Sequence, residues 1–278
     1  MTYRSSLSRR AFLSSVLTTG AALGFALHAR RGFAANTGVC TASAEQVLGP
    51  YYLDKRLVRR DIREHKPGVP LQLRFTVIAL RGCVPLADAL VDVWQCDALG
   101  VYSGFGQLAN SRPPAGTPHG PPPFGLGPAG ANHGPPPGRP PAPRPTDAFT
   151  FLRGVQPADR DGTARFDSIV PGVYPGRTNH VHFRVRSRVD ASHGDHVAYT
   201  GQVFFPEALI APLMRNAAPY RDNRIARVAL TDDPIFASQH GAQAVAHTTL
   251  VDSLDPVRGV VANVIVTIDP GAISRESG

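Results

Sequence analysis

Cysteine is scarce in this 278-residue sequence, and no Cys-x-x-Cys pair occurs. That absence argues against a zinc ribbon and against a dithiol redox motif, because both depend on closely spaced thiols. The three cysteines, Cys40, Cys83 and Cys96, allow one disulfide and one free thiol in a compartment where disulfides persist. Their spacing does not say which two of them pair.

Runs of lysine and arginine are also absent. The formal net charge is +8, but residues 1–35 contain five arginines and no acidic residue, which leaves +3 for the rest of the chain. Nucleic-acid binding depends on a basic patch that matches the phosphates. The charge of this sequence therefore gives no support to a nucleic-acid partner.

Alternating strand and helix units, which would indicate a nucleotide-binding fold, are missing as well. Apolar and polar residues instead alternate with a period of two, as in half-buried strands. We predict an all-β protein, an antiparallel β-sandwich with long loops and few short helices. The predicted strands are Leu71–Ala79, Ala89–Gln95, Thr163–Ile169, His180–Arg188, Ala198–Phe205 and Val260–Ile268, and the predicted helices are Pro206–Asn216 and Asp233–Gln239.

The first 35 residues have the pattern of an export signal. Arg9 and Arg10 directly precede an apolar run from Ala11 to about Ala29, and small residues follow. Paired arginines in this position are typical of the twin-arginine route, which exports folded proteins, and a general secretory signal is the alternative. The run is too short and too interrupted for a stable membrane span. We expect an exported protein, periplasmic or secreted, with one catalytic domain over residues 36–278.

Residues 111–146 interrupt the strand pattern. This segment holds 14 of the 27 prolines and seven of the 27 glycines. Such a composition cannot build a core and favours an extended or disordered loop, with a lid or surface tether as the alternative. Its histidines, His119 and His133, are poor candidates for metal ligands because ordering such a loop costs entropy.

Two histidines lie two positions apart on the predicted strand His180–Arg188. Side chains alternate between the faces of a strand, so His180 and His182 share one face and can bind one metal ion. The alternation assigns three residues to the core: Val181, Phe183 and Val185. The same face as the histidines also carries three arginines, which leave an ordinary solvated surface as the alternative: Arg184, Arg186 and Arg188.

Two tyrosines strengthen the hypothesis of a metal site. Tyr174 lies six residues before His180 in a Val-Tyr-Pro-Gly turn, and Tyr102 lies in the segment Gly-Val-Tyr-Ser-Gly. A free phenol titrates near pH ~10, but a trivalent cation is the largest local charge and stabilises the phenolate. Phenolate oxygen and imidazole nitrogen together suit Fe(III) better than they suit a thiolate-preferring metal.

These segments resemble the intradiol ring-cleavage dioxygenases, a family of non-haem Fe(III) enzymes. VDVWQCDALGVY (91–102) and FDSIVPGVY (166–174) are similar to the family segments that bear two tyrosine ligands, and GRTNHVH (176–182) is similar to the Arg-x-x-His-x-His ending. The resemblance covers most of residues 40–236 apart from the proline-rich segment. Supporting matches are Cys40, Gly49–Tyr52, Asp61–Ile62, Phe151–Gly154 and Gly201–Phe204.

The resemblance implies an all-β Fe(III) enzyme that inserts both atoms of O2 into a catechol-type aromatic. The ring is opened between the two hydroxyl-bearing carbons, and the product is a muconate-type diacid. The implied iron ligands are Tyr102, Tyr174, His180 and His182, with Tyr174 as the axial phenolate that the substrate displaces. Arg177 and Gln202 are implied to line the substrate site.

Some of these assignments have structural alternatives. The permanent charge of Arg177 can stabilise an electron-rich ring, but the residue can equally form a structural salt bridge. Gln202 can be an ordinary exposed strand residue. Trp94, the only tryptophan, is expected in the core, while Tyr51 and Tyr52 either line the pocket or pack at its entrance.

Two departures from the family leave the substrate open. Only about 13 residues separate the expected start of the mature chain from Gly49, which leaves no room for the helical dimerisation domain of catechol and hydroxyquinol dioxygenases. The connection from Tyr174 to His180 is shorter than in protocatechuate enzymes and resembles that of exported single-chain members, and a homo-oligomer is possible. Two other functions stay open: a non-catalytic β-sandwich binding module and a zinc hydrolase, although no carboxylate base is evident for the latter.

Overall fold

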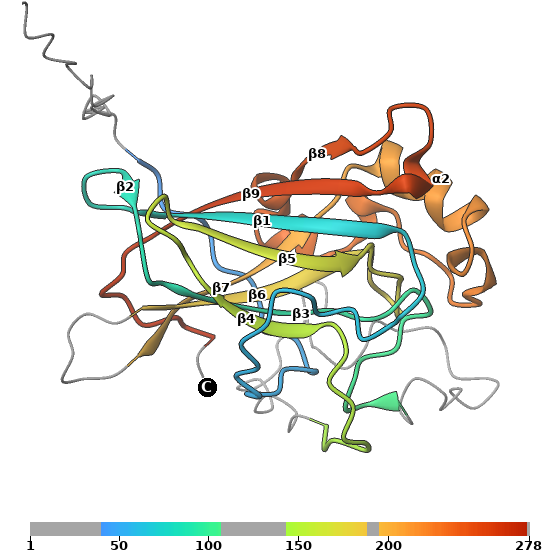
Figure 1. Ribbon diagram of the computed structural model, residues 1–278, viewed down its shortest axis with the longest axis horizontal. Coiled ribbons are helices and arrows are strands. Elements are labelled where there is room, and N and C mark those ends of the chain that lie inside the picture. The colour runs from blue at the N-terminus through green and yellow to red at the C-terminus, as the bar shows by residue number, and fades with distance from the viewer. Residues whose placement is uncertain (1–39, 107–142, 188–194, 277–278) are drawn as a thin grey trace, which may run out of the picture. The chain divides into compact units, whose positions relative to one another are not determined.

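The computed structural model describes residues 40–106, 143–187 and 195–276 (Figure 1). The predicted export signal lies outside these residues, as do Arg188 and most of the segment 111–146 with its two histidines. Strands predominate in the described residues, which confirms the mainly-β prediction. No helix among the described residues is long and apolar enough to cross a membrane.

The strands form two sheets. The larger sheet has the order β2 (Val84–Pro85), β1 (Pro70–Ala79), β9 (Val260–Ile268) and β8 (His247–Leu250), and β5 (Thr163–Ile169) also pairs with β1. The smaller sheet has the order β4 (Arg153–Pro157), β3 (Leu90–Trp94), β6 (His180–Ser187) and β7 (His196–Phe204). Every predicted strand is present, with its ends shifted by a few residues at most.

The sheet built on β1 is mixed. β1 pairs antiparallel with β5 but parallel with β9, which sets Phe75 beside Val264. The prediction of a purely antiparallel arrangement is therefore wrong for this pair. A period of two identifies the faces of a strand but says nothing about the direction of a partner that is distant in sequence. The four strands of the smaller sheet are antiparallel to their neighbours.

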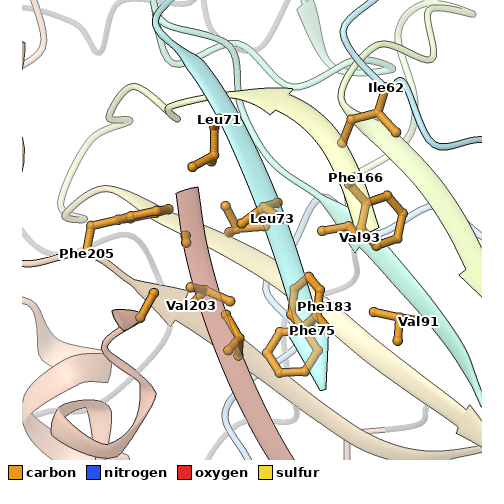
Figure 2. Close-up of a cluster of buried hydrophobic side chains, with 14 of the residues drawn as sticks. Ile62, Leu71, Leu73, Phe75, Val91, Val93, Phe166, Phe183, Val203 and Phe205 are labelled. Carbon is orange, nitrogen blue, oxygen red and sulfur yellow. The ribbon is translucent and has the colours of Figure 1, made fainter. Parts of the chain in front are cut away.

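Apolar side chains from both sheets meet in one buried cluster (Figure 2). The ring centroid of Phe75 on β1 lies 4.8 Å from that of Phe183 on β6, so the two sheets are in direct contact. Val181 and Val185 are buried in the same cluster, as the alternation predicted. Fully burying a side chain of this size stabilises the fold by roughly 1.5–3 kcal/mol.

The opposite face of β6 is buried too. Arg184 and Arg186 are only 3% and 7% exposed, so the alternative of a solvated arginine surface is wrong. Chain segments from both ends of the described domain cover this face. Tyr52 packs its ring against the Arg184 guanidinium, whose Nη2 donates to the carbonyl of Glu276. A strand buried on both faces is what places the two histidines in a water-poor setting.

The helices are short, as predicted. α2 (Glu207–Asn216) and α3 (Pro234–Ser238) lie where helices were expected, and single 3₁₀ turns follow or flank them. These turns are η1 (Tyr220–Asp222), η2 (Leu230–Asp232), η3 (Gly241–Ala244) and η4 (Pro256–Arg258).

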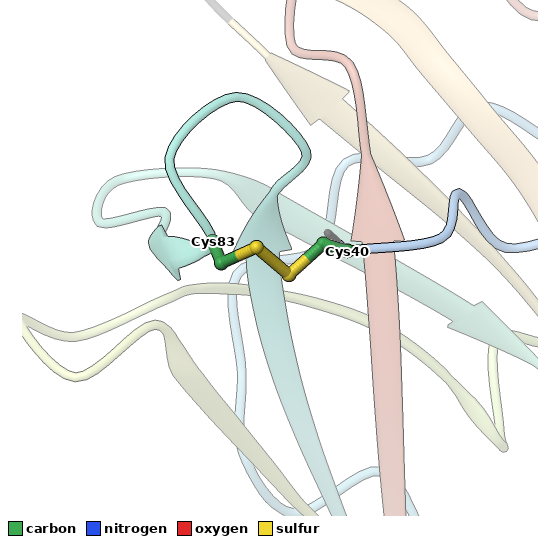
Figure 3. The surroundings of a disulfide bond; sticks show 2 residues. All are labelled: Cys40 and Cys83. Carbon is green, nitrogen blue, oxygen red and sulfur yellow. A yellow bond between two sulfur atoms is a disulfide. The ribbon is translucent and has the colours of Figure 1, made fainter. Parts of the chain in front are cut away.

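One disulfide joins Cys40 to Cys83 with a Cα–Cα distance of 5.7 Å (Figure 3). It ties the first described residue to the turn between β1 and β2. Cys96 is free and buried. The expectation of one bridge and one free thiol is confirmed, and the structure supplies the pairing that the spacing did not.

Candidate metal centre

The two histidines converge at the start of β6. His180 and His182 are 2% and 0% exposed, and their Nε2 atoms lie 3.1 Å apart. Strand alternation places both side chains on the face that is turned away from the apolar core. Two ring nitrogens at this separation are aimed at one point in space.

Backbone and aromatic contacts hold the two imidazoles in place. Nδ1 of His180 lies 2.7 Å from the carbonyl of Thr178, which can only accept, so Nδ1 carries the proton and Nε2 keeps its lone pair. His182 stacks on Trp94, with centroids 5.2 Å apart and ring planes 4° from parallel. A Cβ on Gly49 would lie 2.7 Å from Cε1 of His182, so only glycine fits there.

Both imidazoles are held in the neutral form. Burial lowers the pKa of His180 well below its ordinary value, and the Arg177 guanidinium lowers it further. Burial is also the main cause of the lowered pKa of His182, with His180 and Arg177 adding to it. Neutral imidazole is the form that binds metal ions.

Tyr174 brings a phenol oxygen to the same point. Its Oη lies 3.5 Å from Nε2 of His180, and the side chain is 8% exposed. Burial raises the pKa of Tyr174 to about 12, although the charge of Arg177 lowers it. A phenolate at this position therefore depends on a nearby positive charge.

Tyr102 arrives from the loop after β3. Its ring centroid is 5.6 Å from that of Tyr174 and 6.4 Å from that of His182. Its Oη is buried and has no hydrogen-bond partner among the described residues. Burial raises the pKa of Tyr102 well above its ordinary value. A buried polar atom without a partner is costly, so this oxygen points to a group that the polypeptide does not supply.

A glycine allows the two tyrosine-bearing loops to touch. Gly100 has φ +87°, and a Cβ there would lie only 2.2 Å from the carbonyl oxygen of Val173. Any other residue would push the Tyr102 loop away from the Tyr174 loop. Backbone contact between the loops thus brings together two tyrosines that are distant in sequence.

Arg177 and Gln202 lie beside these four residues. Nη1 of Arg177 is 3.3 Å from Oη of Tyr174, and its Nη2 donates to Oε1 of Gln202 at 2.7 Å. Gln202 is 1% exposed and opposite His182 in the β6–β7 register, so the alternative of an exposed strand residue is wrong. Arg177 also forms a salt bridge with Asp233 at 2.8 Å, and this bridge leaves Nη1 facing the tyrosine.

The aromatic residues that were left open surround the site. Tyr51 stacks on Tyr102 with centroids 4.6 Å apart and meets Tyr174 edge-on at 5.6 Å. Trp94 is 1% exposed, as expected of a core residue, but it packs on His182 rather than in the main apolar cluster. Tyr52 faces the buried arginines instead of the metal candidates.

Sequence reasoning missed three supporting residues. Arg153 donates to the carbonyls of Tyr51 and Ser103 at 2.8 and 2.7 Å, and so fixes the Tyr51 wall against the Tyr102 loop. The Asp147 carboxylate accepts from the backbone N–H of Gly104 and of Gly106 at 2.7 Å each. The third is Asp233. Phe151–Gly154 was among the matching segments, but neither aspartate lies in a segment with a visible motif.

The donor set fits a hard trivalent metal ion. Four side chains supply two imidazole nitrogens and two phenol oxygens as donors. The Oη of Tyr102, which has no hydrogen-bond partner in the described residues, is the clearest indication that a metal ion binds here. No group of three or more His, Cys, Asp or Glu side chains within residues 40–106, 143–187 and 195–276 offers another metal site. Phenol oxygen with imidazole nitrogen matches Fe(III), whereas a zinc site usually has at least three His, Cys, Asp or Glu ligands and the described residues here bring only two histidines together.

Solved structures match the fold of this chain. An intradiol ring-cleavage dioxygenase from Tetranychus urticae matches with a TM-score of 0.66 and 26% sequence identity, over 85% of this chain and 98% of that chain. The chain has the fold of the intradiol ring-cleavage dioxygenases. A second solved dioxygenase matches the intradiol dioxygenase fold of this chain with the same values. No protein-family model matches the chain, and no curated protein matches it in sequence.

The match with this chain extends over nearly the whole length of the solved Tetranychus urticae protein. The six residues that were predicted for the site all lie together in this fold, on the outer face of the smaller sheet and on the two loops that approach it. The roles of these residues as ligands and substrate contacts stay predictions.

Proposed function

We propose that this protein is an Fe(III)-dependent intradiol dioxygenase that acts on a catechol-type aromatic. The observation that carries the proposal is the convergence of four donors. The Nε2 atoms of the two histidines are 3.1 Å apart, Tyr174 Oη is 3.5 Å from one of them, and the nearby Tyr102 Oη has no partner in the described protein. The similarity to the Tetranychus urticae intradiol dioxygenase supports the same conclusion.

Four residues would hold the ion: Tyr102, Tyr174, His180 and His182. When bound, Fe(III) supplies charge neutralisation for a catechol dianion and accepts electron density from it. Burial opposes ionisation of both tyrosines, so an ion of high charge is what their position requires. The tautomer fixed by Thr178 leaves Nε2 of His180 ready to bind.

The remaining residues would manage protons and orientation. Tyr174 Oη can take up a proton from an incoming catechol hydroxyl, because its pKa of about 12 makes the neutral phenol its stable form once it is free. Arg177 keeps a permanent charge 3.3 Å from that oxygen and can stabilise negative charge on the substrate. Gln202 fixes the other end of the guanidinium. Tyr51 offers an aromatic wall against which a flat ring can stack.

Iron analysis and oxygen uptake test the proposal. We expect the purified protein to be red-brown from phenolate-to-iron charge transfer and to consume one O2 per ring opened with catechol, protocatechuate or hydroxyquinol. After a reaction with isotopically labelled O2, mass spectrometry of the diacid should show that both atoms of O2 have been incorporated. Protein that stays colourless after iron loading contradicts the proposal. Coloured protein that consumes no oxygen across the panel favours a binding module instead.

We also propose that the protein is exported through the twin-arginine route. The Arg9-Arg10 pair before an apolar run motivates the choice of route. The Cys40–Cys83 disulfide supports export by either route, because such bonds persist outside the reducing cytosol. The double change Arg9→Lys and Arg10→Lys should leave the precursor in the cytoplasm. Fractionation followed by immunoblotting measures this, and unchanged export would point to the general secretory route.

A further inference from the structure

Asp233 is a buried carboxylate outside the predicted ligand set. It is 0% exposed and lies immediately before α3. One oxygen, Oδ1, accepts from the backbone N–H of Ile235 and of Phe236 at 2.9 Å each, which is helix capping. The other oxygen, Oδ2, faces the candidate metal centre. Asp233 therefore joins a helix end to the site through a single carboxylate.

The Oδ2 atom makes two contacts with the segment that leads into β6. It accepts from Nε of Arg177 and from the backbone N–H of Thr178, each at 2.8 Å. The carbonyl of Thr178 in turn holds Nδ1 of His180 at 2.7 Å. One oxygen thus anchors both a side chain that faces Tyr174 and the backbone that sets the tautomer of His180.

The geometry of the guanidinium explains why this anchor matters. Arg177 has Nε on Asp233 and Nη2 on Gln202, so two edges of its rigid plane are fixed. The third nitrogen, Nη1, is left 3.3 Å from Oη of Tyr174. Without the first contact, the plane can turn about the bond to Gln202, and Nη1 loses its direction.

Charge balance leads to the same residue. Arg177 is 5% exposed, and a buried guanidinium without a counter-charge is strongly unfavourable. Beside a trivalent ion the cost would rise, since like charges repel at short range. Asp233 offsets the arginine charge from the side away from the tyrosines. The Arg177–Asp233 pair carries no net charge, yet the guanidinium nitrogen that faces the site, Nη1, is on its positive side.

We infer that Asp233 is a positioning residue for ring cleavage, which acts by fixing the direction of the Arg177 guanidinium toward the substrate site. This inference rests on the proposed function. It adds a residue that touches no substrate and no metal ligand side chain but determines how a substrate-contacting group is presented.

A double-mutant cycle tests the inference. Asp233→Asn in the wild-type background should lower kcat/KM about 10- to 100-fold and weaken 4-nitrocatechol binding, while the iron content stays unchanged. In an Arg177→Lys background the guanidinium that contacts both Asp233 and Gln202 is absent. There, Asp233→Asn should lower kcat/KM by less than about 3-fold. Equal losses in both backgrounds would show that Asp233 acts independently of Arg177 and would overturn the inference. Unchanged kcat/KM and ligand affinity in Asp233→Asn would overturn it too.

Two controls separate positioning from folding. Asp255→Asn removes a capping carboxylate from η4, where Asp255 accepts from Val257 N–H at 3.1 Å far along the chain from the site, and it should change neither parameter. Asp233→Ser keeps a helix-capping oxygen but loses the arginine contact, so it replaces Asp233→Asn in the cycle if that variant does not fold. A wild-type protein that binds 4-nitrocatechol but opens no ring refutes the proposed function, and the affinities of the variants then decide only whether Asp233 positions Arg177 for ligand binding. A wild type without either property refutes both.

Discussion

The outer face of the smaller sheet carries two neighbouring buried polar clusters, which differ in how their polar and charged groups are paired. At one end, Trp94 lies opposite His182 in the β3–β6 register, and two residues further along, Asp92 lies opposite Arg184. We call the second group the arginine cluster and define it as Tyr52, Asp92, Arg184 and Arg186. Both clusters are buried, both use β6, and both are closed by residues from Gly49 to Tyr52.

The charged groups of the arginine cluster contact one another, although the Nε atoms of Arg184 and Arg186 have no hydrogen-bond partner among the described residues. Tyr52 donates its hydroxyl proton to Asp92 at 2.9 Å and accepts from Nη2 of Arg186 at 2.9 Å, and the Arg184 guanidinium lies 4.4 Å from the centre of the Tyr52 ring. At the histidine end, no carboxylate contacts an imidazole in the described residues, and Oη of Tyr102 and Nδ1 of His182 have no partner there. The unpartnered atoms of the arginine cluster are guanidinium N–H donors, whereas the histidine end leaves a phenol oxygen, the Oη of Tyr102, that can bind a metal ion.

The largest effect on the difference between the two clusters is expected from the removal of a histidine. His182→Ala should abolish iron binding and ring cleavage, because it deletes one of two converging nitrogens while β6 keeps its apolar face in the core. Metal analysis and oxygen uptake measure the loss, and circular dichroism should show that the β fold persists.

His247→Ala is the matched control, since His247 is an exposed histidine on β8. It should keep full iron content and activity. Retention of both properties in His182→Ala would reject the assignment of His182 as a ligand.

A smaller effect is expected when the imidazole is only displaced. Gly49→Ala introduces a Cβ 2.7 Å from Cε1 of His182 at a backbone φ of +74°. We expect roughly 10- to 100-fold weaker iron affinity or activity, as for other changes that misorient a ligand. Competition with a chelator measures the affinity.

Gly271→Ala is the control, because the nearest atom to its added Cβ is a side-chain oxygen of Asp269 at 3.5 Å, an ordinary contact. Iron affinity in Gly49→Ala equal to that of Gly271→Ala would mean that the close packing against His182 has no role.

The arginine cluster should respond through stability rather than activity. Burial raises the pKa of Asp92 from 3.8 to about 6, against the lowering effect of Tyr52 and Arg186. The folded protein then binds this proton more tightly than the unfolded chain does. The contribution of Asp92 to the free energy of unfolding is therefore present at low pH and is lost as the pH rises from about 4 to about 6.

Asp92→Asn removes this titration. The difference in unfolding free energy between wild type and variant should change by on the order of 2 kcal/mol across the window, as measured by urea denaturation at a series of pH values. The exposed Asp161→Asn variant should run parallel to wild type. Parallel curves for Asp92→Asn as well would contradict the prediction, and iron content should not change in either variant.

The sequence predicted local features well and remote ones poorly. Strand positions follow from alternation, and His180 and His182 share a face for the same reason. β4 was missed because Arg-Gly-Val-Gln-Pro contains two residues that rarely occur within strands. The direction of β9 was wrongly predicted as antiparallel, because its partner β1 is far away in sequence. The tyrosines were joined to the histidines by family resemblance, not by spacing alone.

The same limit applies to burial around the site. Arg184 and Arg186 looked solvated because the segments that cover them, near Tyr52 and Glu276, are more than 90 positions away. Asp233 is 56 positions from Arg177 and belongs to no visible motif. Periodicity describes one strand, and these contacts depend on which distant segments pack on it.

The closure between Gly104 and Asp147 has a consequence for how this protein can be changed. Thr146 N–H donates to the carbonyl of Gly104 at 2.7 Å, so the described residues on the two sides of the segment 107–142 are joined two residues beyond Tyr102. The entropic cost of joining such ends grows only with the logarithm of length, about 0.6 kcal/mol for each doubling. We therefore expect both sheets to stay intact when this connection is shortened or when a separate module is inserted into it. A module inserted at this point would join the chain close to the candidate metal centre without any change in the residues that build it.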